Sequence, residues 1–211
     1  MDLVEVSAVV LAQVHNPTIL HPSFLTAEHI VPADWELATP PISMPPLATA
    51  TYKSGVSFTA DESRLSVRDI RPLGGGERFR AFRLAGAYVQ TLPHVPYTAV
   101  GINFHVFVAA DDAQRRLREY IFSDDFFTGP LEDPQTFSVV VQHRMERGTR
   151  SLTISPAERD LGRPGISVNS NYHVVISAEN RLQNTLQALE AAEARWNDLT
   201  TIMQIEQRLV N

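Results

Sequence analysis

A chain of 211 residues is long enough to bury a substantial core, and one domain is the default expectation at this length. The formal net charge of −6 argues against a nucleic-acid binder, although a local basic patch could outweigh the total. The absence of cysteine excludes disulfides and thiolate metal sites, and it fits a reducing cytoplasm.

The N-terminal segment comes nearest to a signal peptide, but Asp2 and Glu5 stand where such peptides carry positive charge. Val4 and Val6 begin an alternating apolar pattern instead, so we expect a strand over residues 3–14. No apolar run approaches the roughly 20 residues of a membrane helix. We therefore expect a cytoplasmic protein without a membrane partner.

Residues 15–48 form a connection that contains seven prolines, which disfavour long regular structure. A short helix is predicted over residues 23–30. The connection also carries apolar side chains, including Trp35, that a disordered linker would lack. We expect it to be ordered and held to the domain by Trp35. A connection of this length is typical of a functional segment or an interface.

The next segments predict a hairpin over residues 50–58 and 64–70, followed by a helix over residues 77–92. Residues 97–109 then alternate without a break and predict the central strand of a sheet. Its apolar face should be covered by helices, whereas Gly101, Asn103, His105 and Phe107 fall on the other face. The apolar face consists of Val100, Ile102, Phe104, Val106 and Val108.

The second half of the chain predicts a helix over residues 111–122, strands over 137–146, 149–157 and 165–178, and a last helix over 180–209. Hairpin-linked strands indicate a mainly antiparallel sheet. We therefore predict a single α+β domain over residues 1–211, in the order βββ-α-β-α-βββ-α. Helices should cover one face of the sheet, and the chain should close with a long amphipathic helix.

The apolar stripe of the last helix runs further than one domain would be expected to cover. A single chain would leave Trp196, Leu199 and Met203 partly exposed, which predicts a homo-oligomer or another protein partner. In the alternative, the Pro-rich connection of the same chain covers this stripe. The interface candidates are Leu186, Leu189, Trp196, Leu199, Met203 and Trp35.

No motif of nucleophilic, metal or phosphoryl chemistry is present, and we expect no catalytic residue, no metal and no cofactor. The seven histidines show neither HxH nor HExxH spacing. Strand alternation does place several amides and imidazoles on one face of the sheet. This face is either a small polar site or an ordinary solvated surface. Its residues are Asn103, His105, Asn169, Asn171 and His173.

Residues 64–83 contain six arginines against Asp69 and Glu77, a density that could bind an anion or a nucleic-acid backbone. Arg78, Arg80 and Arg83 are the candidates for such a patch. In the alternative, these arginines face solvent in different directions and never converge.

Two parts of the sequence resemble other proteins. The motifs HNPTIL, IVPADWEL and LPHVPYTAVGIN, all in the first half of the chain, resemble an uncharacterised group of bacterial proteins. That resemblance implies a bacterial, intracellular source and no particular reaction. Residues 137–209 are similar in architecture to SecB-like export chaperones, which place an antiparallel sheet before a long helix and assemble as oligomers.

These observations favour a non-enzymatic interaction protein of chaperone or adaptor type that self-associates or serves as a subunit of a complex. An anion- or nucleic-acid-binding module that uses residues 64–83 is the alternative. A third class, an enzyme that uses the Asn/His face, would require a concave pocket with perturbed titrating groups there.

Overall fold

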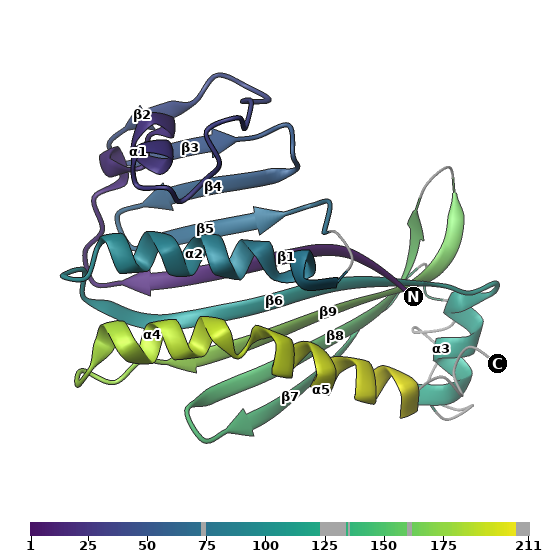
Figure 1. Ribbon diagram of the computed structural model, residues 1–211. Coiled ribbons are helices and arrows are strands. Elements are labelled where there is room, and N and C mark those ends of the chain that lie inside the picture. Colours follow the sequence, from purple (N-terminus) through teal and green to yellow (C-terminus); the bar gives the residue numbers. More distant parts are fainter. Residues whose placement is uncertain (73–74, 123–133, 135, 160–161, 206–211) are drawn as a thin grey trace.

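The computed structural model describes residues 1–72, 75–122, 134, 136–159 and 162–205. Within these residues, nine antiparallel strands form one sheet in the order β2-β3-β4-β5-β1-β6-β9-β8-β7 (Figure 1). The strands are β1 (Asp2–Ala12), β2 (Ile42–Met44), β3 (Leu47–Thr51), β4 (Val56–Asp61), β5 (Arg64–Asp69), β6 (Tyr97–Ala109), β7 (Val139–Met145), β8 (Gly148–Arg159) and β9 (Arg163–Val175). The predicted α+β class and mainly antiparallel sheet are confirmed.

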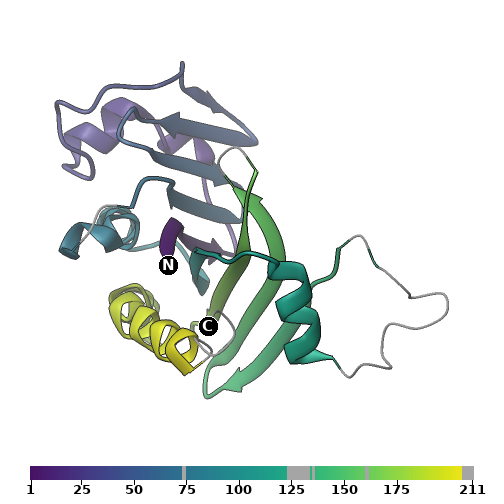
Figure 2. The same cartoon turned by 90° about the vertical axis from the view of Figure 1, so that its right-hand side faces the viewer.

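Helices cover one face of this sheet as predicted. The α-helices are α1 (Pro22–Ala27), α2 (Arg80–Thr91), α3 (Ala113–Ile121), α4 (Arg181–Glu190) and α5 (Ala192–Ile205), with 3-10 turns η1 (Pro17–Ile19) and η2 (Gly75–Phe79). α2 lies over β1 and β5, and the α4–α5 pair lies beside it over β6 (Figures 1 and 2). α3 stands apart from these helices and packs against β8 and β9.

β6 is a long interior strand next to the middle strand, β1, and it pairs with β1 on one side and β9 on the other. Its alternating apolar side chains point to the helices, and Val100, Ile102, Phe104 and Val106 are fully buried. The ring of Phe104 is surrounded by other aromatic rings. The centroid distances are 6.5 Å to Phe79, 5.8 Å to Phe82, 6.4 Å to Tyr172 and 5.4 Å to Trp196.

The first half of the sheet contains more strands than the sequence patterns predict. The strand expected over residues 50–58 is two strands, β3 and β4, joined by a tight turn. Gly55 has a φ of +91° in this turn, a conformation that side chains with a Cβ rarely adopt. The Pro-rich connection also contributes β2, which pairs with β3. The short helix expected at residues 23–30 is α1, and Leu25 on it is buried.

The last helix bends at Ala191, where α4 ends and α5 follows at once. Residues 206–211, and with them the end of the predicted 180–209 helix, lie outside the described residues. Both helices contact β6, so the bend keeps the apolar stripe on the twisted sheet.

This packing corrects the expected exposure of the last helix. Leu189, Trp196 and Leu199 are buried within the chain's own core, and Leu186 and Met203 are partly buried. The sheet covers them, whereas the Pro-rich connection lies over the β3–β4 end. The expectation of an exposed apolar patch on this helix was therefore wrong.

A buried ion pair fixes α2 to the sheet. Arg80 donates from Nε to Oδ2 of Asp69 at 2.5 Å and from Nη2 to Oδ1 at 2.9 Å. The side chain of Asp69 is fully buried and that of Arg80 is 8% exposed. Arg80 Nη2 also donates to the carbonyl oxygen of Ser54 at 2.8 Å, and the guanidinium lies 5.9 Å from the ring centroid of Trp35. One side chain thus joins β5, α2, the β3–β4 turn and the Pro-rich connection.

Replacing Phe104 with Ala should lower the free energy of unfolding by about 3–5 kcal/mol, because a cavity opens at the centre of the aromatic cluster. Urea denaturation measures this change. The exposed Gln183→Ala on α4 is the control and should stay within about 0.5 kcal/mol of the parent. A Phe104→Ala variant as stable as the parent would show that β6 is not central.

Removing one member of the Asp69–Arg80 pair should cost about 3–5 kcal/mol, because the remaining charge is buried without its partner. We expect the Asp69→Leu, Arg80→Met double variant to lose less than the sum of the two single variants. A double-mutant cycle by chemical denaturation measures the difference. Additive losses would mean that the two side chains are not energetically coupled.

Candidate functional site

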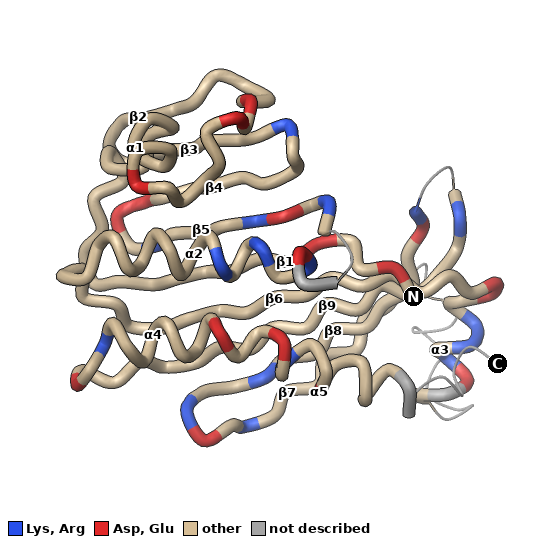
Figure 3. Tube along the Cα trace, in the orientation of Figure 1, with Lys and Arg blue, Asp and Glu red and all other residues tan. Residues whose placement is uncertain are grey.

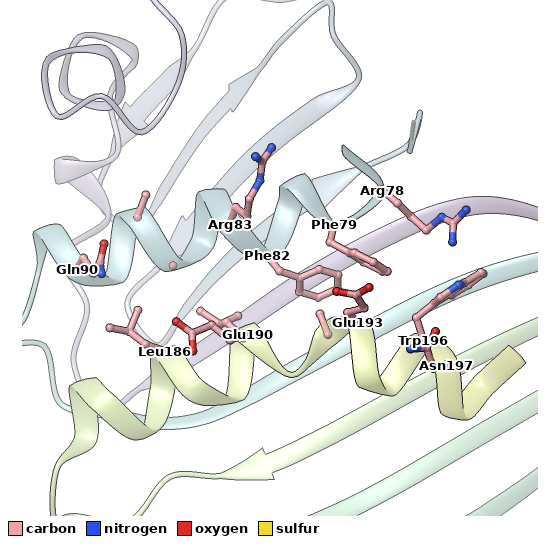
Figure 4. A pocket seen from close by; sticks show the side chains of 14 residues that line it. Arg78, Phe79, Phe82, Arg83, Gln90, Leu186, Glu190, Glu193, Trp196 and Asn197 are labelled. Carbon is pink, nitrogen blue, oxygen red and sulfur yellow. The ribbon is translucent and has the colours of Figure 1, made fainter. Parts of the chain in front are cut away.

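The helix layer contains a groove of about 740 Å³ between α2 and the α4–α5 pair (Figure 4). We call it the helix groove. Its lining residues are Arg78, Phe79, Phe82, Arg83, Gly86, Ala87 and Gln90 from the η2–α2 side and Leu186, Leu189, Glu190, Ala192, Glu193, Trp196 and Asn197 from the α4–α5 side. Its volume lies in the range of ligand-binding clefts, which is about 300–1,000 Å³.

The floor of the helix groove is apolar and well fixed. Phe79 and Phe82 lie with ring centroids 6.4 Å apart, and Phe82 and Trp196 both pack on Phe104 beneath them. Because Phe104 is a buried residue of β6, the floor rests directly on the sheet. Rigid aromatic side chains bury large apolar area with little loss of side-chain entropy on binding.

The two walls of the helix groove carry opposite charges. Arg78 and Arg83 project from the η2–α2 wall, and Glu190 and Glu193 from the α4–α5 wall (Figures 3 and 4). Arg78 lies over the ring of Trp196 at 5.1 Å, and Arg83 pairs with Glu77 at 3.0 Å. A ligand in the groove therefore meets a basic edge on one side and an acidic edge on the other.

Gly86 keeps part of the helix groove open. A Cβ built at this position would lie 3.9 Å from Cδ2 of Leu186, which is an ordinary contact distance. An alanine therefore fits, whereas a larger side chain would project into the space between α2 and α4. Glycine in a helix interior costs roughly 0.5–1 kcal/mol relative to alanine, so the open space is maintained against helix propensity.

The polar groups in the lining of the helix groove are few. Among the described lining residues, Glu190 and Glu193 are the carboxylates, and no hydroxyl, imidazole or amine accompanies them. Sequence patterns singled out Arg78, Arg83, Leu186, Leu189 and Trp196 separately but did not reveal the groove. Its two walls are about a hundred residues apart in the chain, and no sequence signal paired them.

The predicted polar face exists on the opposite side of the sheet. Cross-strand register places Asn171 opposite Asn103 and Asn169 opposite His105, and His173 lies one pair further along, opposite Gly101. All five predicted residues, Asn103, His105, Asn169, Asn171 and His173, therefore share one face of β6 and β9, and we call them the polar strip.

Hydrogen bonds connect most of the polar strip. Asn171 Nδ2 donates to Oδ1 of Asn103, and Asn103 Nδ2 donates to the carbonyl oxygen of Ser7 at 3.3 Å. His105 Nε2 lies 3.0 Å from Oγ of Ser167. The predicted polar face did not include Ser7 and Ser167. Apolar and polar residues alternate along β1 and β9, and both serines occupy positions on the polar face.

The cavity at the polar strip is small, about 110 Å³, and is lined by Glu5, Asn103 and His105 among others. Partial burial lowers the pKa of His105, the nearby Glu5 carboxylate opposes this shift, and Arg159 and Arg68 add to it. The volume lies below the usual range for ligand sites. We therefore interpret the strip as a hydrogen-bonded sheet surface rather than a substrate pocket.

The arginines of residues 64–83 do not converge on one surface. Arg64 and Arg68 alternate with the buried Leu65 and Val67 and therefore lie on the face away from the helices. Acidic residues accompany the basic ones along β5 and around the start of α2 (Figure 3). The ion pairs are Arg64–Asp61, Arg68–Glu5, Arg80–Asp69 and Arg83–Glu77. Of the predicted patch, Arg80 is buried, and Arg78 and Arg83 belong to the helix groove.

Trp35, the sixth interface candidate, is half-buried and packs edge-on against Tyr52 with ring centroids 5.3 Å apart. Among the described residues, no group of three or more histidine, aspartate or glutamate side chains is placed to hold a metal ion. No described helix has the length and apolar character needed to span a membrane.

No protein-family model and no curated protein matches this chain. The function is therefore inferred from the residues and geometry of the chain itself.

The pKa of His105 should lie below the usual 6.5, because partial burial disfavours the imidazolium. As the pH falls below 6.5, the unfolded chain takes up the proton first. The contribution of His105 to stability should thus be complete above pH 6.5 and decline towards the lower pKa of the folded state. An NMR titration, assigned with His105→Gln, measures this pKa. A value at or above 6.5 would show that the ring is not desolvated.

Proposed function

We propose that this protein is a non-enzymatic interaction protein of chaperone or adaptor type. It binds an apolar segment of a partner polypeptide in the helix groove. The observation that carries the proposal is the groove itself, which has an aromatic floor of Phe79, Phe82 and Trp196 between walls of opposite charge. Apolar grooves between helices are a recurrent way of recognising amphipathic helices.

The charges on the walls define the chemistry of the bound segment. Basic residues of the segment should face Glu190 and Glu193, and acidic residues should face Arg78 and Arg83. A segment with an apolar stripe, one basic edge and one acidic edge fits this arrangement in one orientation. Such complementarity adds specificity and orientation more than affinity.

The architectural resemblance of residues 137–209 to SecB-like chaperones supports the same class. As part of this proposal the protein acts in the bacterial cytoplasm, and the complete absence of cysteine accords with a reducing compartment. Anion or nucleic-acid binding by residues 64–83 has less support, because four of these arginines already have acidic partners.

A fluorescein-labelled helical peptide tests the proposal. It carries leucines at positions i, i+3, i+4 and i+7, with arginines along one edge of this stripe and glutamates along the other. Fluorescence anisotropy should show saturable binding. Gly86→Leu should weaken binding by about tenfold or more, because the new side chain occupies the groove.

The matched control is Gly86→Ala, whose Cβ fits and which should bind the peptide like the parent. A peptide with serines in place of the leucines should not bind. Undiminished binding by Gly86→Leu, or equal binding of both peptides, would contradict the proposal. Binding that ignores the leucines and falls steeply with salt would instead favour the anion-binding function.

A further inference from the structure

β7 is an outer strand of the sheet, and no described residue pairs with its second edge. Within the described part of the chain, β8 is its one pairing partner. Five of its seven residues are exposed, and they include Val140 at 61% and Val141 at 38% exposure. An exposed edge strand with apolar side chains is a ready template for another strand, and natural proteins usually protect such edges.

The other outer strand is protected in the usual way. β2 has only three residues and is flanked by Pro40 and Pro41 on one side and Pro45 and Pro46 on the other. Short strands and nearby prolines discourage the addition of a further strand. β7 has seven residues and no proline. The two edges therefore differ, and β7 is the one suited to pairing.

We propose that β7 pairs in antiparallel fashion with β7 of a second copy of this chain, around a two-fold axis at Val140. In this register Val140 faces Val140 of the second copy, and Val139 faces Val141 on each side of the axis. The three consecutive valines thus meet only valines. Cross-strand pairs of β-branched residues are favourable in sheets.

The charges on β7 are compatible with this register. Strand pairs with strand over Val139–Val141, and Arg144 faces Thr136 of the second copy, which precedes β7 in the chain. The two Arg144 side chains lie roughly 27 Å apart along the strands, at about 3.4 Å per residue. Moving the axis to Val141 would set Val139 against His143, and moving it to Arg144 would set two arginines opposite each other. Like charges directly opposite destabilise a strand pair, which excludes the register centred on Arg144. An axis at Gln142 would pair all seven residues of β7 but would set Val140 against Arg144, so we favour the register in which valines meet only valines.

Pairing at β7 would also extend an existing apolar surface. Val139 lies opposite Ile154 and Val141 opposite Leu152, which is buried on β8. A second copy would continue this row across the axis, so that one sheet runs through both molecules. The sequence predicted self-association through the last helix, whereas the present proposal places it at the β7 edge of the sheet. The inference is independent of what the helix groove binds, since no residue of β7 lines that groove.

The mass of the protein in solution tests the dimer. Multi-angle light scattering should give twice the mass of a 23.5 kDa chain at tens of micromolar. A Val140→Lys, Val141→Lys double variant should weaken dimerisation by about 100-fold or more, because the two lysines at position 140 would lie directly opposite each other and each lysine at position 141 would face an apolar valine. The matched control on the other edge, Ile42→Lys with Met44→Lys, should remain dimeric, and far-UV circular dichroism should show all three proteins folded.

The register has a separate test, because the chain contains no cysteine. Under mild oxidation Val140→Cys should form a covalent dimer much faster than Ile42→Cys, since paired residues lie within reach of a disulfide. A mixture of Val139→Cys and Val141→Cys should cross-link faster than either variant alone. A monomeric parent protein, or a dimer unaffected by the β7 lysines, would overturn the proposal. Cross-linking at equal rates by all cysteine variants would overturn the register.

Discussion

The buried ion pair between Asp69 and Arg80 is the interaction on which the arrangement of the helix layer depends. Asp69 ends β5, and Arg80 begins α2, so the pair sets where α2 starts above the sheet. Two charges gain little net free energy when they are buried together, but a misplaced α2 would leave both unpaired. We infer that the pair contributes to the specificity of this placement of α2, whose first turns carry the basic wall of the helix groove.

The floor of the same groove depends on Phe104 of β6. Trp196 reaches this ring from α5 and Phe82 reaches it from α2, so a single strand residue spaces the two walls. The geometry of the groove therefore depends on the aromatic cluster, and that cluster is centred on a residue of β6. A surface built on regular elements holds its geometry better than one built on loops, and this physical argument supports the proposal that the helix groove binds a partner.

Most of the correct sequence-based predictions came from the alternation of apolar and polar residues along strands. It located β6, its helix-covered face and the polar strip, because a period of two assigns each residue to a face without knowledge of its neighbours. It failed at residues 50–58, where the alternating pattern was followed across Ser54–Gly55, although this pair is a turn signal. It also failed for the helix groove and for the burial of Trp196. Those features depend on which distant segments meet, and a single sequence does not encode that in its local pattern.

The position of β1 has a consequence for biosynthesis. The order of the sheet joins β2–β5 to β6–β9 only through β1, which pairs with β5 at Val6–Asp69 and with β6 at Val6–Phe104. β1 precedes both of its partners in the chain, so its second side is paired only after residue 109 has been synthesised. Until then its apolar face has half of its final strand neighbours. Vectorial synthesis thus delays the joining of the two halves of the sheet until β6 has been made, and one edge of β1 lacks its partner over that interval.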